Sequence, residues 1–270
     1  MTKTAQERLN DIFERMAKDY KKLSAKEQQF AIKEFARVRG DLSDLLSDFA
    51  GKDGTIKRQR INRLLRELDE IETALRRYGM DAMNHAIDAS AAFATDRINK
   101  AFERVVGRPA ISGSMTRLNR DVALYVTKRF GYDGLVLSDR VWRLAGDQRD
   151  DIAKVLRSDI LQGESTSKMI ADVRKVQDNE TWKIKRLVIT EGNTAYRVAT
   201  SYNAQRSKLV KALELHPGAK RSPACSDLSN EDRYGLGRGI FLPDDPDIYN
   251  PHPQCTSYLT YVLDGSDYED

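Results

Sequence analysis

The sequence predicts a mainly α-helical protein: a long helical hairpin or bundle, then a helical block, then a small irregular α+β module at the C-terminal end. Proline is confined to that end, because six of the seven prolines lie at or after Pro217 and the first 215 residues contain only Pro109. Before this point, apolar residues recur at helical spacing. Since proline is rare inside helices and common in turns, the helical body should end near His216.

Two helices are predicted at the N-terminal end. The first carries one apolar stripe, formed by Leu9, Ile12, Phe13, Met16 and Tyr20. A second stripe predicts another helix, which the turn-forming sequence AGKDGT then ends; its residues are Phe30, Phe35, Val38, Leu42, Leu45 and Leu46.

A much longer helical pattern follows from Ile61. Its apolar residues continue at i, i+3, i+4 and i+7 spacing until Gly107-Arg108-Pro109, with Gly79 as the one weak point. The pattern predicts one helix of about fifty residues, or two helices joined near Gly79. A helix of this length needs a partner to cover its apolar face, which favours a hairpin or bundle.

The second helical block contains several shorter helices. Ser138 is a good N-cap for the first of them. The following stretch divides at Gly163, with Ser165 or Thr166 capping the next helix. A last helical pattern runs on to Leu215.

These patterns divide the chain into three predicted regions. Residues 1–110 form an N-terminal helical region for docking or self-association, residues 111–215 form a helical core, and residues 216–270 form a loop-rich module with a histidine and cysteine cluster.

Charge is distributed unevenly along the chain. Residues 216–270 contain four basic and ten acidic side chains, a net charge of −6, whereas residues 1–215 contain 41 basic and 31 acidic ones, a net charge of +10. A basic body suggests contact with a polyanion or with an acidic protein surface. Because basic and acidic residues are interleaved, a solvated helix surface is an equally good interpretation.

The composition also restricts the cellular setting. No apolar run approaches the length of about eighteen residues needed to span a membrane, and the N-terminal sequence lacks the apolar segment of a secretory signal. Two cysteines are too few for a disulfide scaffold. We therefore expect the protein to mature in a reducing cytoplasm.

Two of the three histidines and both cysteines lie in one short stretch. The spacing of His252 and Cys255 lets a tight turn present imidazole and thiolate to one ion, and His216 and Cys225 would complete a tetrahedral zinc site. Zinc would then contribute folding free energy to a module with little core of its own. A disulfide between the cysteines remains an alternative, as do buried thiols packed as small apolar groups beside hydrogen-bonded histidines.

Thr190 and Glu191 lie in the last long helical pattern and are predicted to anchor the C-terminal module. The Glu191 carboxylate could pair with an arginine along the helix, or accept backbone N–H groups from a loop of the module. Catalysis would need a partner acid, base or metal, and the sequence around Glu191 offers none. No residue is therefore predicted to be catalytic.

The order of these motifs resembles the phage head morphogenesis family, the Mu F-like minor head proteins. The similar segments are, in order, GLVLSDRVW, ILQGESTSKMIADVR, ITEGNTAYRVATSYN, a cysteine, GIF and HPQC. They extend over residues 134–263, and the helices before them fit the family only loosely. The ordered set is more specific than any one segment.

The chain departs from the family pattern at the cysteines. Relatives often carry Cys-x-x-Cys where this chain has only Cys225, with Leu228 at the second position. Relatives often end in His-Pro-x-Cys-x-Cys, whereas Cys255 is followed by Thr-Ser. If the paired cysteines of relatives bind zinc, this chain would have to use His216 instead.

The resemblance implies a minor capsid protein of the virion head, near the portal vertex, that acts by binding during procapsid assembly in the host cytoplasm. Its partners would be the portal protein and other head proteins, in several copies per virion, with double-stranded DNA as a further partner during packaging or ejection. Two alternatives are a metal-dependent nuclease-like module, since YNPHPQC is faintly similar to His-Asn-His sites, and a free DNA-binding protein that uses the basic helices.

Overall fold

The computed structural model describes residues 3–218 and 222–265, so parts of the predicted C-terminal module, residues 219–221 and 266–270, lie outside the described residues. The mainly α fold with a small C-terminal sheet is confirmed. The chain divides into two compact units, and neither unit is continuous in sequence. Unit 1 comprises Met1–Glu27, Asn84–Tyr132 and Arg186–Asp270, and unit 2 comprises Gln28–Met83 and Asp133–Lys185. Among the described residues, no helix has both the length and the apolar character needed to cross a membrane.

Two long helices of the N-terminal half of the chain, α1 and α3, each contribute residues to both units. The helix α1 (Ala5–Phe35) extends further than predicted, so that Phe30 and Phe35 belong to it and not to the second helix. The helix α3 (Ile61–Val106) runs through Gly79 without a break, so the first of the two predicted alternatives, a single long helix, is the one present.

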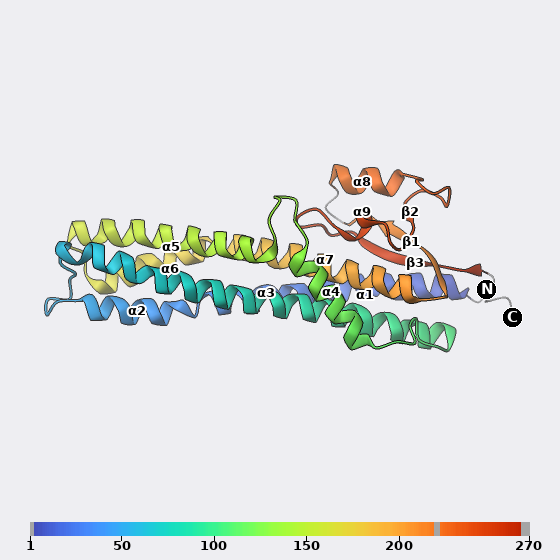
Figure 1. Ribbon diagram of the computed structural model, residues 1–270, viewed down its shortest axis with the longest axis horizontal. Coiled ribbons are helices and arrows are strands. Elements are labelled where there is room, and N and C mark those ends of the chain that lie inside the picture. The colour runs from blue at the N-terminus through green and yellow to red at the C-terminus, as the bar shows by residue number, and fades with distance from the viewer. Residues whose placement is uncertain (1–2, 219–221, 266–270) are drawn as a thin grey trace. The chain divides into compact units, whose positions relative to one another are not determined.

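Unit 2 is built from helices around an apolar core. It contains α2 (Val38–Phe49), η1 (Arg58–Arg60), α5 (Leu137–Gln162), α6 (Thr166–Asn179) and the first part of α3. The helix α6 packs against both α2 and α5, and Figure 1 shows these helices gathered beside α3. The core side chains come from all of them, among them Leu42, Leu46, Leu64, Leu68, Ile152, Leu156, Met169 and Val173.

The connection between α5 and α6 follows the sequence prediction. Gly163 adopts a left-handed conformation with φ 76° and ends α5. The Ser165 hydroxyl accepts a hydrogen bond from the Lys168 backbone at 3.3 Å and caps α6. The backbone of Thr166 also donates to the Gly54 carbonyl at 2.9 Å, so this connection pairs with the turn after α2.

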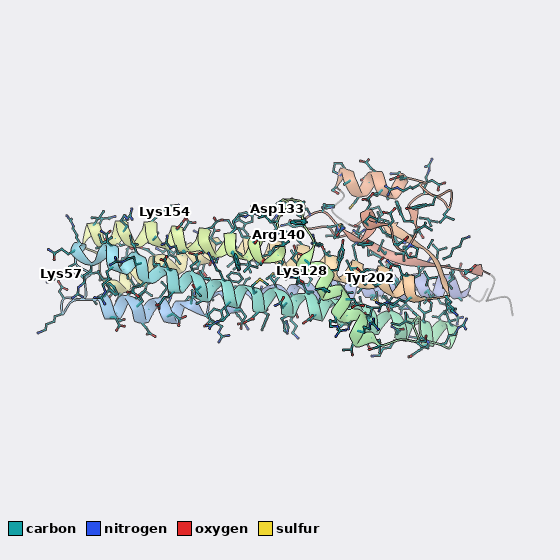
Figure 2. The ribbon with its side chains drawn as sticks, viewed as in Figure 1. Lys57, Lys128, Asp133, Arg140, Lys154 and Tyr202 are labelled. Atoms are coloured by element: carbon teal, nitrogen blue, oxygen red, sulfur yellow. The ribbon has the colours of Figure 1, made fainter. Side chains whose placement is uncertain are left out.

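The prediction that Ser138 caps α5 is wrong. The helix begins one residue earlier, and its N-cap position is Val136, whose side chain cannot accept a hydrogen bond. Asp133 organises this end instead, because its Oδ1 accepts the Leu135 backbone N–H at 3.3 Å and the Arg140 Nε at 3.0 Å. Figure 2 labels Asp133 and Arg140 side by side at the start of the helix. An acidic group before the first turn also suits the positive end of the helix dipole.

Unit 1 combines parts of α1 and α3 and most of α7 (Thr181–Arg206) with α4 (Met115–Lys128), α8 (Pro223–Asn230) and α9 (Pro246–Tyr249). Its antiparallel sheet has the order β2-β1-β3, with β1 (Val210–His216) between β2 (Ile240–Phe241) and β3 (Tyr258–Leu263). Figure 1 shows the sheet beside α8 and α9.

The prediction that helix continues to Leu215 is wrong, because α7 ends at Arg206 and the next residues form β1. Lysine, alanine, leucine and glutamate in this segment favour helix locally. Pairing with β3 overrides that preference, since Leu213 lies opposite Tyr261 and Leu215 lies opposite Leu259. Both leucines are buried in this arrangement.

Tyr261 on β3 joins the sheet to the helices of unit 1. Its buried ring packs against Phe13 of α1 at 4.8 Å and Phe102 of α3 at 5.7 Å between centroids. Its hydroxyl donates to the Thr200 carbonyl of α7 at 2.6 Å. The side chain of Gln6 accepts the backbone N–H of Leu263 at 2.9 Å. The N-terminal helices and the C-terminal module therefore share one core.

Gly79 allows three helices of unit 2 to approach closely. A Cβ atom at this position would lie 2.7 Å from Phe35 Cζ on α1 and 2.7 Å from Val141 Cγ1 on α5. Ordinary carbon contacts are about 3.5–4.0 Å, so a methyl group does not fit unless the helices move apart.

We predict that Gly79→Ala destabilises the protein although alanine is the better helix former by about 1 kcal/mol. Overpacking of this kind costs about 1–3 kcal/mol, which exceeds the gain in helix propensity. Gly146→Ala on α5 is the control, because the nearest atom to its Cβ would be Glu72 Oε1 at 3.7 Å. Urea unfolding should show a lower midpoint for Gly79→Ala and an unchanged or higher midpoint for Gly146→Ala. Equal behaviour of the two variants would contradict the close packing.

Candidate metal centre

Cys225 is held at the beginning of a short helix. Ser222 is the N-cap of α8, and its hydroxyl accepts the Cys225 backbone N–H at 3.2 Å. Pro223 occupies the first turn, where its missing N–H costs nothing. The sequence Ser-Pro-Ala-Cys thus fixes the direction of the Cys225 side chain, which is buried.

The HPQC motif forms a tight turn that brings its two ends together. The Cys255 backbone N–H donates to the His252 carbonyl at 3.1 Å. Pro253 and Gln254 occupy the central positions, and Gln254 has φ 58°. Proline followed by a residue with positive φ is the pattern of a type II turn, in which glycine is normally preferred at the second position. The predicted tight turn is present, and glutamine in it indicates that neighbouring contacts hold the conformation.

Three potential ligand atoms converge where α8 meets this turn. The Sγ atoms of Cys225 and Cys255 are 3.5 Å apart, and His252 Nε2 is 3.1 Å from Cys225 Sγ. All three ligand atoms lie within 4.8 Å of one another. Tetrahedral zinc would place two sulfurs about 3.8 Å apart and a sulfur about 3.6 Å from a nitrogen. The group could therefore hold a metal ion with small adjustments.

The imidazole of His252 is oriented for ligation. Its Nδ1 donates to the Pro253 carbonyl at 2.9 Å, which leaves the lone pair of Nε2 directed at Cys225 Sγ. A second hydrogen bond that fixes the tautomer in this way is typical of histidines that bind metals.

The two thiols interact strongly and are both almost fully buried. The hydrogen bond from the Cys255 thiol lowers the pKa of Cys225 to about 4, and the same bond, together with burial, raises the pKa of Cys255. The shared hydrogen bond therefore favours the loss of one proton from the pair. A bound metal would displace the remaining proton.

Arg197 of α7 lies beneath the cysteines. Its side chain is 2% exposed, and its Nη1 donates to Cys255 Sγ at 3.6 Å and to Ser257 Oγ at 3.3 Å. Burial lowers the pKa of Arg197, and this effect is opposed by the nearby Cys255 and Cys225. Its Nε and Nη2 have no hydrogen-bond partner among the described residues. A buried guanidinium needs negative charge nearby, which thiolates supply.

The fourth predicted ligand, His216, does not join this group. It is the last residue of β1, where its Nε2 lies 2.8 Å from Thr260 Oγ1 and its ring stacks on Tyr258 with centroids 5.0 Å apart. Strand pairing with Tyr258 fixes this position. The predicted two-histidine, two-cysteine set is thus reduced in the structure to Cys225, His252 and Cys255.

Cys225 and Cys255 are both free thiols, so the alternative of a disulfide between them is not present in the structure. Their sulfurs are separated by 3.5 Å, well beyond the S–S bond length of about 2.05 Å.

One face of α7 connects the helix to the HPQC turn. The Thr190 hydroxyl accepts the Gln254 backbone N–H at 3.4 Å, and the Asn193 amide donates to the Cys255 carbonyl. With Arg197, these residues follow the spacing of one helical face. The sequence prediction named Thr190 but not Asn193 or Arg197 as contacts of the module. Three polar residues at this spacing in a largely buried helix were the signal that could have identified them.

Glu191 lies on an adjacent part of α7 and is 1% exposed. Its Oε2 accepts a hydrogen bond from Arg129 Nη2 at 2.9 Å, and Arg129 also donates to the Thr194 hydroxyl at 3.0 Å. Arg129 is the C-cap residue of α4. The ion pair therefore fastens the end of α4 to α7, whereas the sequence prediction placed the anchoring role of Glu191 at the C-terminal module.

The comparisons with known proteins give no relative for this chain: no family model, no curated protein and no solved structure matches it.

We predict that Glu191→Ala lowers the free energy of unfolding by about 3–5 kcal/mol, because it leaves the Arg129 guanidinium buried without its partner. Glu191→Gln keeps an acceptor oxygen and should cost less. Asp96→Ala is the control, since its ion pair with Lys100 has side chains 68% and 49% exposed and should contribute little. Urea unfolding compares the three variants. A Glu191→Ala protein as stable as the control would show that the pair does not anchor α4.

Proposed function

We propose that this chain is a phage minor head protein that associates with the portal vertex and acts by binding during head assembly. The proposal starts from the ordered motifs that resemble the Mu F-like minor head proteins. Portal protein and other head proteins would be its partners in the virion, and double-stranded DNA would be a further one.

The observation that carries the proposal is the contact between two of those motifs. Thr190 and Asn193 from the segment ITEGNTAYRVATSYN hydrogen-bond the backbone of Gln254 and Cys255 in HPQC. Arg197 of the same segment reaches the Cys255 thiol. The contacts between these two motifs are buried, which indicates a structural role for their residues. A structural role is expected for a protein that acts by binding during assembly.

Burial of the metal-binding group also favours binding over catalysis. Cys225 and Cys255 are only 4% and 1% exposed, so a substrate would have no direct route to an ion between them. Both ring nitrogens of His252 are engaged, so this histidine is not free to act as the general base that a nuclease-like module requires.

We further propose that the ion is zinc. Two thiolates and one imidazole form a soft ligand set that suits zinc, and such sites often supply folding free energy to small modules. Zinc usually takes four ligands. The Ser257 hydroxyl is an oxygen donor that already lies 2.7 Å and 3.4 Å from the two sulfurs.

The function is tested on the phage that encodes the chain. Purified heads should contain the chain in several copies, and antibody labelling should place it at one vertex. Mixed with isolated portal rings, the purified chain should sediment with them in a stoichiometric complex that resists salt. Absence of the chain from heads, or even labelling over the whole capsid, would overturn the proposal.

The zinc proposal predicts about one zinc ion per chain in protein purified without chelators. His252→Gln and Cys255→Ser should each lower the zinc content sharply. In limited proteolysis of these variants, the loops around α8 should be cleaved earlier than the long helices. His216→Gln is the matched control, because His216 lies outside the group and should leave the zinc content unchanged. Protein with reduced cysteines and far less than stoichiometric zinc would contradict the proposal.

A further inference from the structure

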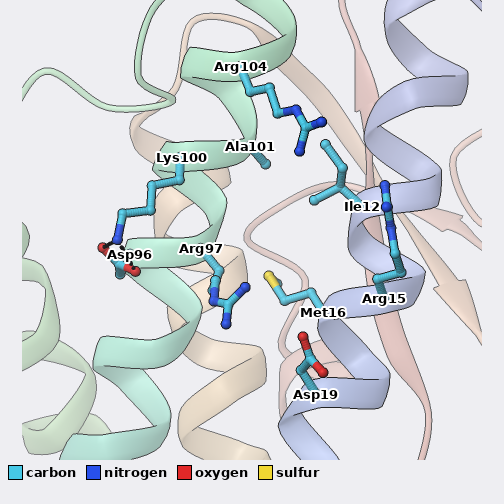
Figure 3. Close-up of a pocket in the computed structure, with 9 residues that line it drawn as sticks. All are labelled: Ile12, Arg15, Met16, Asp19, Asp96, Arg97, Lys100, Ala101 and Arg104. Carbon is cyan, nitrogen blue, oxygen red and sulfur yellow. Dashed lines mark hydrogen bonds and ion pairs between the residues drawn. The ribbon is translucent and has the colours of Figure 1, made fainter.

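An open, positively charged pocket lies between α1 and α3 within unit 1, on elements that take no part in the metal centre. Its volume is about 450 Å³. The lining consists of an apolar floor and a charged rim, formed by Ile12, Arg15, Met16, Asp19, Asp96, Arg97, Lys100, Ala101 and Arg104. Figure 3 shows the side chains of Arg97 and Arg104 extending from α3 toward α1.

The acidic groups of the pocket are already neutralised. Asp96 pairs with Lys100 at 2.9 Å, and Asp19 pairs with Lys22 at 3.2 Å. Neither carboxylate forms an ion pair with Arg97 or Arg104 in the part of the chain that the structure describes. The pocket thus presents guanidinium groups that have not been paired by its own acids.

Its arginines are available to an external anion. Arg97 and Arg104 are exposed, and no carboxylate of the described residues pairs with either of them. The Arg97 guanidinium is supported by the ring of Phe93, whose centroid lies 5.3 Å away. Arg15 Nε donates to the backbone carbonyl of Asp11 at 3.1 Å. A backbone carbonyl carries no net charge, so this contact does not neutralise the positive charge of Arg15.

We propose that this pocket binds the phosphodiester backbone of double-stranded DNA. The planar guanidinium fork matches phosphate oxygens, and phosphate contacts dominate nucleic-acid affinity. Arg97 and Arg104 share one face of α3 and lie about 10 Å apart along it, so they can contact two phosphates of one strand. The apolar floor of Ile12 and Met16 suits the sugar edges between them. Because these contacts read no bases, binding is independent of sequence.

This inference deepens the proposed function and rests on it only for the source of the DNA. Portal association is expected to resist salt, whereas contacts with phosphates release counterions and weaken as salt rises. A variant that loses DNA binding should still sediment with portal rings. Failure of one proposal can therefore be distinguished from failure of the other.

The test uses the full-length chain and a short fluorescent DNA duplex, with affinity measured by anisotropy over a series of salt concentrations. The variant Arg97→Gln/Arg104→Gln removes two exposed charges from the pocket. The control Arg66→Gln/Arg157→Gln removes two exposed charges from unit 2, and so changes the net charge equally. Circular dichroism should show both variants folded, since all four side chains are exposed.

The wild-type chain should bind duplexes of unrelated sequence equally well. The pocket variant should bind more weakly, and the slope of log affinity against log salt should fall by about 2, one for each lost phosphate contact. The control should keep the wild-type slope. No binding by the wild-type chain, or an equal loss in the control, would overturn the proposal. Inorganic phosphate that occupies the pocket as tightly as the duplex would also overturn it, because the pocket would then be a small-anion site.

Discussion

The hydrogen bonds that one face of α7 makes to the HPQC turn are the contacts on which the C-terminal module depends. The module has little regular structure to satisfy its own backbone, since β2 has two residues and α9 has four. Buried backbone groups must find partners elsewhere, and an unpaired one costs about 1–3 kcal/mol. Thr190 accepts the backbone N–H of Gln254, and Asn193 donates to the backbone carbonyl of Cys255. These contacts explain how a glutamine is kept at positive φ in a turn that would otherwise favour glycine.

Arg197 adds a buried charge to this joint and connects it to the cysteines. A guanidinium that is 2% exposed is costly unless anionic groups surround it, and the thiols are the acidic groups within its reach. The relation is reciprocal, because an N–H group directed at a sulfur also stabilises the thiolate that a metal requires. The guanidinium therefore connects the helix, the turn and the candidate metal centre electrostatically.

Much of the helical architecture could be predicted because its signals are local. Apolar periodicity identified α3 over its whole length, and Gly163 with Ser165 identified the boundary between α5 and α6. The strand β1 was missed because its residues favour helix and only pairing with Tyr258–Leu263 makes it a strand. At the site, the spacing of His252 and Cys255 in a Pro-containing turn was sufficient to predict their proximity. The exclusion of His216 was not predictable, since it depends on strand register and on the partners Thr260 and Tyr258.

The strand that follows the metal centre also packs against the two helices that line the basic pocket. Phe13 and Phe102 stand next to the floor residues Ile12 and Ala101, and the ring of Tyr261 lies against both aromatic rings. Tyr261, four positions after Ser257, therefore packs against both α1 and α3 next to the pocket. Ser257 itself contacts both cysteines and Arg197. The strand β3 therefore links the candidate metal centre, through Ser257 just before its first residue, to the packing of α1 and α3 beside the pocket, although no side chain is shared between the two sites.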